Sequence, residues 1–320
     1  MTSPAEQGPA GPILGVDIGG TKTAVCLAHA DGRIVARQAF ATAEPQATIR
    51  RIVSTARRLA ARFAGIGISC GGPLDWRAGI IQSPPNLPGW DDVAITDELQ
   101  ARLQAPAWLD NDANAGALAE WRFGAARQCQ HLIFLTCGTG MGAGLILDGR
   151  LYRGQTGLAG EVGHIRLAEA GPVGHRKSGS FEGFCSGGGI ADLARIMRCQ
   201  QHPPSALDGL ADEQLTARRI GQAAADGDQL ARSVVQRSGH YLGRALAILV
   251  DIFNPELIVL GPLAWRLGQL WLAPARRVLQ AEALPASLAA CRIIPTALGE
   301  AIGDYAALAV ALDGMAARRA

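Results

Sequence analysis

The chain begins its first apolar segment with Ile13-Leu14-Gly15-Val16-Asp17-Ile18-Gly19-Gly20-Thr21-Lys22. A second apolar run follows directly as Thr23-Ala24-Val25-Cys26-Leu27-Ala28, and Asp31-Gly32 then marks a tight turn. Apolar runs on both sides of a glycine turn, closed by an Asp-Gly pair, are typical of antiparallel strands. This stretch therefore predicts a three-stranded meander over residues 13–40.

The same pattern occurs again near the middle of the chain. Leu132-Ile133-Phe134-Leu135-Thr136-Cys137 leads into Gly138-Thr139-Gly140-Met141-Gly142, then into Ala143-Gly144-Leu145-Ile146-Leu147 and a second Asp-Gly pair, Asp148-Gly149. We expect a second meander over residues 132–153. Each glycine turn could be a plain hairpin turn, but glycine also lets backbone amides approach an anion closely. Two related turns, one in each half of the chain, favour the binding of a polyphosphate.

Two common phosphate motifs do not fit these turns. Gly15 and Gly20 have the spacing of a Walker A loop, but Thr21 stands where the lysine belongs and no helix follows. Gly138 and Gly140 match a dinucleotide-binding string, yet a strand rather than a helix comes next. We instead expect Thr21, Thr139 and the glycine amides to bind phosphate oxygens, with Asp17 orienting the hydration shell of Mg²⁺.

The remainder of the chain predicts an α/β protein with mixed sheets, because strands alternate with helices between the two meanders. We expect helices over 48–63 and 238–253, and a strand at 107–109 that precedes another helix. The polar, glycine-rich segment 154–189 is long for a connection inside a domain, which favours a functional role. A domain break is expected near residues 115–130.

The composition excludes several classes of protein. The 320 residues carry a net charge of +2 and a pI near 8.2, which does not indicate a nucleic-acid surface. The seven cysteines form no CxxC pair, which favours a reducing compartment. Residues 1–12 do not resemble a secretion signal, and no uncharged run is long enough to cross a membrane. We therefore expect a cytoplasmic protein without a nucleic-acid or membrane partner.

The run Asp110-Asn111-Asp112-Ala113-Asn114 stands between a strand and a helix. Either carboxylate, or Asn111, could cap the helix, since all three side chains are good caps. Either carboxylate could also be a general base. The pattern alone does not decide between Asp110 and Asp112.

Four ordered blocks resemble the signature blocks of the ROK family (repressor, open reading frame, kinase) in the sugar kinase, Hsp70 and actin superfamily. They are Asp17-Ile18-Gly19-Gly20-Thr21-Lys22, Leu109-Asp110-Asn111-Asp112-Ala113-Asn114-Ala115, Gly138-Thr139-Gly140-Met141-Gly142 and Ala159-Gly160-Glu161-Val162-Gly163-His164. The resemblance implies two ribonuclease H-like lobes with mixed sheets around a central cleft, a possible homodimer, and transfer of phosphate from Mg²⁺-bound ATP to a hexose or N-acetylhexosamine hydroxyl. The lobes would span 13–120, with a C-terminal helix at about 299–318 packed on it, and 121–298. A disordered tail would cover 1–12.

The resemblance also implies roles for individual residues. Asp112 matches the family's general base. The sugar-side positions are Gly72, Asn86, Asn111, Asp112, Glu161, His164 and Glu182. The nucleotide-side positions are Asp17, Gly19, Gly20, Thr21, Lys22, Gly138, Thr139, Gly140, Gly142 and Gly261. Ser186-Gly187-Gly188-Gly189 is either a further nucleotide contact at a helix start or a plain loop.

The chain departs from the family pattern in two places. Many members bind zinc through the motif histidine and three cysteines, but here Val173, His175 and Ser180 replace the cysteines. His175 and Cys185 lack the spacing to substitute, so we expect no zinc, with Phe181 and Phe184 helping to hold the loop. Pro262 interrupts the glycine run that the family places beside the nucleoside, and proline has no N–H to donate.

Several functions fit this resemblance. The first is a glucokinase-like enzyme that makes a sugar 6-phosphate. The alternatives are an N-acetylmannosamine kinase, an N-acetylglucosamine kinase or a fructokinase. A non-catalytic, sugar-sensing regulator is the alternative from another class. A repressor would need a DNA-binding segment before the first strand, and only 12 residues precede it. The presence of Asp112 and of both glycine turns argues against a catalytically silent sugar-binding protein.

Overall fold

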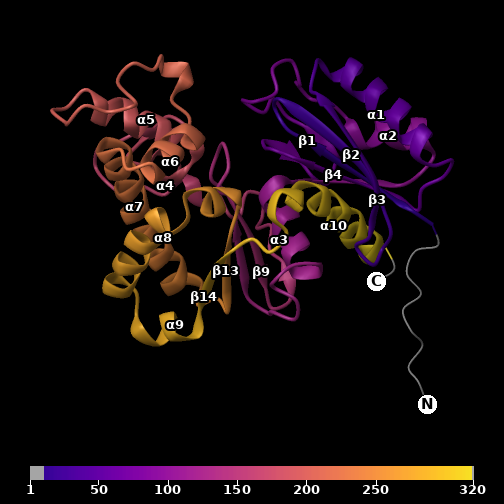
Figure 1. Cartoon of the computed structure of the whole chain (residues 1–320). Helices are drawn as coiled ribbons and strands as arrows, with labels where there is room; N and C mark the ends of the chain where they lie inside the picture. Colours follow the sequence, from indigo (N-terminus) through magenta and orange to yellow (C-terminus); the bar gives the residue numbers. More distant parts are fainter. Residues whose placement is uncertain (1–10, 319–320) are drawn as a thin grey trace. The chain divides into compact units, whose positions relative to one another are not determined.

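The computed structural model describes residues 11–318, so the expected tail is described only at residues 11 and 12. The chain divides into two compact units. Unit 1 comprises residues 1–127 and 300–320, and unit 2 comprises residues 128–299. Figure 1 shows their elements.

Unit 1 is built on a five-stranded sheet with the strand order β3-β2-β1-β4-β7. Strands β1 to β3 form the antiparallel meander that the first glycine turn predicts, and β1, β4 and β7 are parallel. The strands are β1 (Ile13–Ile18), β2 (Lys22–Ala28), β3 (Ile34–Ala41), β4 (Gly65–Cys70), β7 (Ala107–Asn111) and the short pair β5 (Leu74–Asp75) and β6 (Ile80–Ile81). The helices are α1 (Pro45–Leu59), α2 (Ile95–Leu103), α3 (Asp112–Arg122) and α10 (Ile302–Ala317).

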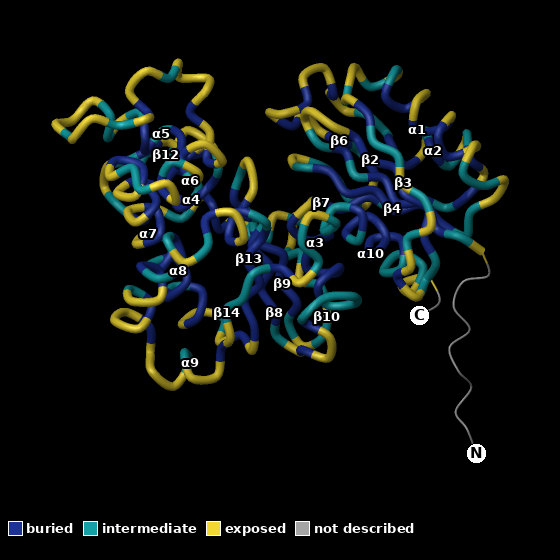
Figure 2. The backbone as a smooth tube through the Cα atoms, viewed as in Figure 1, coloured by how far each residue is buried: buried dark blue, intermediate teal, exposed yellow. Residues whose placement is uncertain are grey.

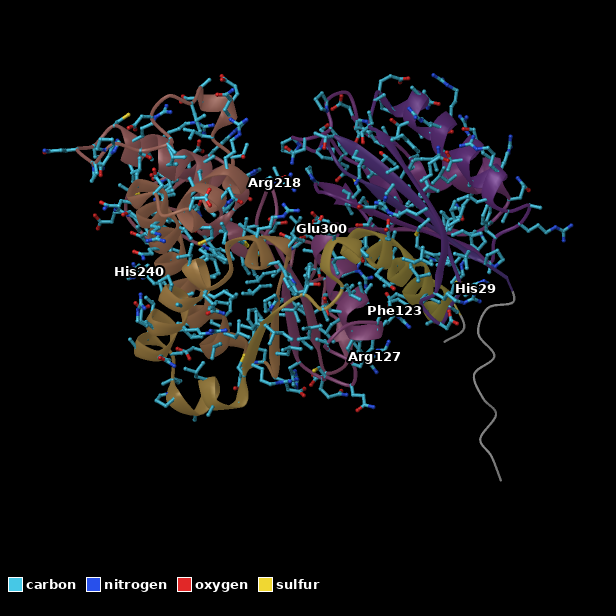
Figure 3. All side chains as sticks on the ribbon, viewed as in Figure 1. His29, Phe123, Arg127, Arg218, His240 and Glu300 are labelled. Carbon is cyan, nitrogen blue, oxygen red and sulfur yellow. The ribbon has the colours of Figure 1, made fainter. Side chains whose placement is uncertain are left out.

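Helix α10 returns from the end of the chain to cover β1 and β4. Gly67 on β4 makes this close contact possible, since a Cβ at that position would lie 1.9 Å from the Ala307 carbonyl oxygen. Phe123, which follows α3, lies beside α10 in Figure 3 and approaches the Tyr305 ring at a centroid distance of 5.5 Å. The C-terminal segment thus completes the core of unit 1.

Unit 2 repeats the sheet topology of unit 1, with the strand order β10-β9-β8-β13-β14. Again the first three strands are antiparallel, and β8, β13 and β14 are parallel. The strands are β8 (Leu132–Leu135), β9 (Ala143–Leu147), β10 (Arg150–Leu151), β13 (Leu257–Leu260), β14 (Arg292–Pro295) and the small hairpin β11 (Val173–Gly174) and β12 (Lys177–Ser178). The recurring sequence pattern therefore does correspond to a recurring fold, with buried central strands in both units (Figure 2).

Helices make up most of the rest of unit 2. They are α4 (Phe181–Cys185), α5 (Gly187–Arg198), α6 (Ala217–Ala225), α7 (Gln229–Phe253), α8 (Pro262–Glu282), α9 (Pro285–Ala290) and the 3₁₀ turns Val162–His164, Asp212–Gln214 and Gly299–Ala301. The prediction that the long helix begins at residue 238 is wrong. It begins nine residues earlier, because the Asp228 side chain accepts a hydrogen bond from the Ala231 amide, 2.8 Å away, and caps it there. None of the described helices has the length and hydropathy that a membrane crossing requires.

Candidate active site

The carboxyl ends of the parallel strands of unit 1 bring its candidate residues to one edge of the sheet. Asp17 near the end of β1 pairs in register with Ser69 on β4, which pairs with Asp110 on β7. The first glycine turn follows β1 and Gly72 follows β4, so both lie at the same edge. In open α/β sheets this edge is where ligands bind.

The structure separates the two neighbouring carboxylates that the sequence leaves equivalent. Asp110 is buried, and its Oδ1 accepts hydrogen bonds from the Asn111 amide at 2.9 Å and from Asn114 Nδ2 at 2.8 Å. Asn111 caps α3, since its Oδ1 accepts from the Asn114 amide at 2.8 Å. Asp112 is the first residue of α3 and is exposed. Asp110 therefore supports the turn, whereas Asp112 is an exposed residue at the start of α3.

The first glycine turn, residues 19–21, is held by its own backbone and by Thr42. The Gly19 amide donates to the Lys22 carbonyl at 3.0 Å, and Thr42 Oγ1 donates to the Gly19 carbonyl at 2.7 Å. Gly20 contacts Asn86, because a Cβ at Gly20 would lie 2.4 Å from the Asn86 carbonyl oxygen. Gly20 and Asn86, both predicted site residues, thus lie side by side. Close packing against Asn86 is by itself a reason for glycine at position 20, whether or not a phosphate binds there.

Asp17 lies among other carboxylates. Its burial, together with repulsion from Asp112 and Asp304, raises its pKa from 3.8 to about 6, against the attraction of Lys22 and Arg37. Asp304 on α10 is itself buried and pairs with Arg37 at 2.6 Å. Asp304 and Arg37 could not be found from the sequence, since they lie 267 positions apart and neither belongs to a motif.

Replacing Asp17 with asparagine should stabilise the protein above pH 6. The pKa of Asp17 is higher in the folded chain than in the unfolded one, so ionisation of Asp17 lowers the free energy of unfolding. This destabilisation is absent below about pH 4 and reaches its full size above about pH 6. The substitution should recover up to about 3 kcal/mol at pH 7.5 and little at pH 4. Thermal unfolding at the two pH values measures this difference, and a variant less stable than the wild type at pH 7.5 would contradict it.

In unit 2, the second glycine turn, residues 138–142, is braced by two side chains. Thr136 Oγ1 accepts from the Gly142 amide at 3.0 Å, and Glu182 Oε2 accepts from the Met141 amide at 3.0 Å. Gly138 and Thr139 are exposed at the tip. Glycine is not needed at position 138 for the fold, because a Cβ there would meet only the Thr136 carbonyl oxygen at 3.9 Å, and its φ is not left-handed. The close approach of a ligand would explain it.

The block that carries Glu161 and His164 packs on this turn. The Ala143 amide donates to the Gly160 carbonyl at 2.8 Å, and a Cβ at Gly163 would lie 2.1 Å from the Met141 carbonyl oxygen. Burial and the charge of Glu182 raise the pKa of Glu161, while His175 and His164 lower it. Three predicted sugar-side residues, Glu161, His164 and Glu182, therefore gather beside the second glycine turn.

The β11–β12 hairpin holds this block in place. The His175 ring approaches the His164 ring edge-on, with centroids 5.8 Å apart, and Lys177 Nζ donates to the His164 carbonyl at 2.8 Å. The rings of His175 and His164 thus lie close together, and no group of three or more His, Cys, Asp or Glu side chains in residues 11–318 is arranged to hold a metal. Cys185 is buried, with its Sγ donating to the Ser238 carbonyl at 3.4 Å. Phe184, also buried, stacks on Tyr241 at 3.5 Å.

Two helix starts border the second glycine turn. Ser186 caps α5 by accepting from the Gly189 amide at 3.0 Å, and the Gly187 amide donates to the Gly138 carbonyl at 2.8 Å. Gly261 precedes α8 and contacts β8, where a Cβ would lie 1.9 Å from the Thr136 carbonyl oxygen. The structure therefore brings Gly261 and the 186–189 run to the turn, and Pro262 is the first residue of a helix, a position that needs no N–H.

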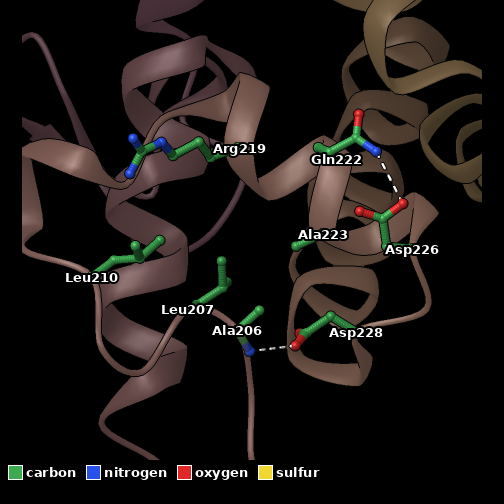
Figure 4. Close-up of a pocket in the computed structure, with 8 residues that line it drawn as sticks. All are labelled: Ala206, Leu207, Leu210, Arg219, Gln222, Ala223, Asp226 and Asp228. Carbon is green, nitrogen blue, oxygen red and sulfur yellow. Dashed lines mark hydrogen bonds between the residues drawn. The ribbon is translucent and has the colours of Figure 1, made fainter.

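A hollow in unit 2 is lined by other residues than these (Figure 4). Its acidic side chains are already engaged: Asp226 accepts from Gln222 Nε2 at 3.0 Å, and Asp228 accepts from the Ala206 amide at 2.8 Å while it caps α7. These contacts serve the local fold and do not indicate a ligand.

Known proteins resemble the chain over nearly its whole length. A glucokinase from Thermotoga maritima is 33% identical over 310 residues, which cover 93% of this chain and 96% of the relative. A ROK family glucokinase from Streptomyces griseus, solved with glucose and AMPPNP, has a TM-score of 0.78 at 30% identity and covers 95% of this chain and 100% of that one. A ROK family transcriptional regulator, a homologue of the E. coli MLC protein, has a TM-score of 0.81 at 25% identity and covers 93% and 77%. The model of the ROK family matches residues 13–312, and the chain belongs to that family.

Proposed function

We propose that this chain, a sugar kinase of the ROK family, transfers the terminal phosphoryl group of ATP to a hydroxyl of glucose and releases glucose 6-phosphate. The observation that carries the proposal is the contrast between Asp110 and Asp112. Asp110 is buried and hydrogen-bonded to its own turn, whereas Asp112 begins α3 as an exposed residue. The exposure of Asp112 supports its assignment as the group that accepts a proton from the substrate.

The chemistry asks little covalent work of the protein. In phosphoryl transfer a positioned carboxylate accepts the proton of the attacking hydroxyl, and the other groups hold the reactants and neutralise charge. Asp112 would take this proton. Asn111, Asn86, Gly72, Glu161, His164 and Glu182 would bind the hydroxyls of the sugar.

The glycine turns would hold the phosphates. The positions assigned to the nucleotide are Gly19, Gly20, Gly138, Gly140 and Gly142, the hydroxyls of Thr21 and Thr139, Lys22, and the backbone at Gly261. The amides of Gly19, Gly138 and Gly142 already donate within their own turns, so these three glycines would serve by letting the phosphates approach closely. Mg²⁺ would neutralise phosphate charge when bound, and Asp17 would orient its hydration shell. The raised pKa of Asp17 fits this role, since a cation nearby would relieve the repulsion between Asp17, Asp112 and Asp304.

A Gly138→Ala variant should weaken ATP binding without disturbing the fold. The added methyl group has room in the protein but stands where a phosphate would approach. Loss of one hydrogen bond to a charged oxygen should raise the KM for ATP about tenfold or more, with an unchanged KM for sugar and an unchanged melting temperature. Gly209→Ala, where the methyl group meets nothing within 4 Å, is the matched control. An unchanged KM for ATP would remove Gly138 from the phosphate site.

A substrate panel tests the proposal as a whole. ADP release is measured with glucose, mannose, fructose, N-acetylglucosamine and N-acetylmannosamine, and the sugar phosphate is identified by NMR. We expect glucose to give the highest kcat/KM. A higher kcat/KM for another sugar would show that this sugar, and not glucose, is the preferred substrate. ATP hydrolysis without a sugar phosphate, or no turnover on any sugar, would overturn the kinase and favour a non-catalytic regulator, since one relative is a transcriptional regulator. Metal analysis of the same sample should find less than one zinc per chain.

A further inference from the structure

Three parallel strands of unit 2 end side by side at the edge that carries the second glycine turn. Leu135 at the end of β8 pairs with Leu260 of β13, which pairs with Pro295 of β14. Neighbouring strands lie about 4.8 Å apart, so the end of β14 is roughly 10 Å from the end of β8, which leads into the glycine turn. A ligand whose phosphates bind at the turn could therefore extend along this edge towards β14.

Trp265 is fixed at the far end of that edge. Its Nε1 donates to the Thr296 carbonyl at 2.9 Å, and the Thr296 amide donates to the Leu260 carbonyl at 2.7 Å. The side chain is nevertheless 64% exposed, although tryptophan is usually well buried. Trp271, beyond the kink that Gly268 makes in α8, is fully buried and donates to Ser238 Oγ. Trp265 is thus a large aromatic side chain that is anchored by one atom and exposed to solvent.

The same helix start connects Trp265 to the glycine turn. The Gly261 amide donates to the Leu135 carbonyl at 2.8 Å, and the Leu263 amide donates to the Cys137 carbonyl at 3.2 Å. The first turn of α8 is therefore hydrogen-bonded to the segment that leads into the turn. Pro262 contributes no N–H, so the backbone offers no donor to a base at that position.

We propose that Trp265 stacks on the purine of the nucleotide whose phosphates bind at residues 138–142. This inference rests on the proposed kinase function and assigns the residue that holds the nucleoside. Stacking on an aromatic ring depends little on which base is present, because every base has a π face. ATP and GTP should then bind with similar affinity, and a polyphosphate without a base should bind more weakly than either.

The test compares ADP with inorganic tripolyphosphate by calorimetry on the whole chain without sugar. Trp265→Ala should raise the Kd for ADP about tenfold, because one base–aromatic stack is lost, and leave the Kd for tripolyphosphate unchanged. Trp265→Phe should bind ADP nearly as well as the wild type, since the ring remains. Ile252→Ala, at a 66% exposed position on α7, is the control that should change neither.

Each other outcome is decisive. No ADP binding by the wild type, or an unchanged Kd for ADP in Trp265→Ala, would overturn the inference. Equal losses for ADP and tripolyphosphate would also overturn it, because Trp265 would then act only by supporting the turn. The sugar panel is independent of these results. If the wild type phosphorylates glucose but Trp265→Ala binds ADP normally, only the stacking inference fails. If the wild type turns over no sugar but Trp265→Ala binds ADP weakly, only the proposed kinase function fails.

Discussion

Replacing Asp112 with asparagine should lower kcat for sugar phosphorylation by about 100- to 10,000-fold, the range that a general base contributes. The amide has the shape of the carboxylate but cannot accept the proton of the attacking hydroxyl. Binding should change far less than turnover, so KM values for sugar and ATP should stay within a few-fold of the wild type. Steady-state kinetics with product detection measures the effect. A variant that keeps more than a tenth of kcat would show that Asp112 is not the base.

Asp110→Asn is the matched control for this variant. Asp110 is buried and holds both Asn111 and Asn114, so its replacement should cost about 1–3 kcal/mol of stability. Asp112 is exposed at the start of α3, where losing its favourable interaction with the helix dipole should cost about 1 kcal/mol at most. The pair should therefore separate loss of catalysis from loss of structure. Equal losses of stability would mean that Asp112 also supports the turn.

The strand pattern around the glycine turns could be predicted from the sequence because its cause is local. Asp148 and Gly149 both adopt left-handed backbone conformations between β9 and β10, which is why an Asp-Gly pair marks that hairpin. The shared topology of the two sheets follows from the repeated pattern. The edge that collects the ends of β1, β4 and β7 follows from parallel pairing alone.

The sequence could not predict features that depend on contacts between distant residues. The choice between Asp110 and Asp112 depends on burial, and the pKa of Asp17 depends on Asp304, which returns on α10. The β11–β12 hairpin was missed for another reason. Its strands have two residues each, and its turn places His175 and Arg176, rather than the usual glycine or asparagine, in left-handed conformations.

The second large effect is expected at Glu182, which serves two neighbours at once. Its Oε2 accepts from the Met141 amide in the glycine turn, and its charge raises the pKa of Glu161 beside it. If Glu182 also binds a sugar hydroxyl, Glu182→Ala removes two hydrogen bonds to a charged group, each worth about 1.5–3 kcal/mol. We expect kcat/KM for the sugar to fall about 100-fold or more and the KM for ATP to rise, as steady-state kinetics with each substrate varied would show.

Two further variants divide this effect into its parts. Glu182→Gln keeps an oxygen that can accept from Met141, so ATP should bind almost normally while the sugar loses its charged partner. Thr136→Val removes only the other brace of the turn, the hydroxyl that accepts from Gly142, and should raise the KM for ATP alone. If Glu182→Ala reproduces the pattern of Thr136→Val, Glu182 only braces the turn. If Glu182→Gln instead loses sugar and not ATP, the same carboxylate serves the sugar and holds the phosphate turn.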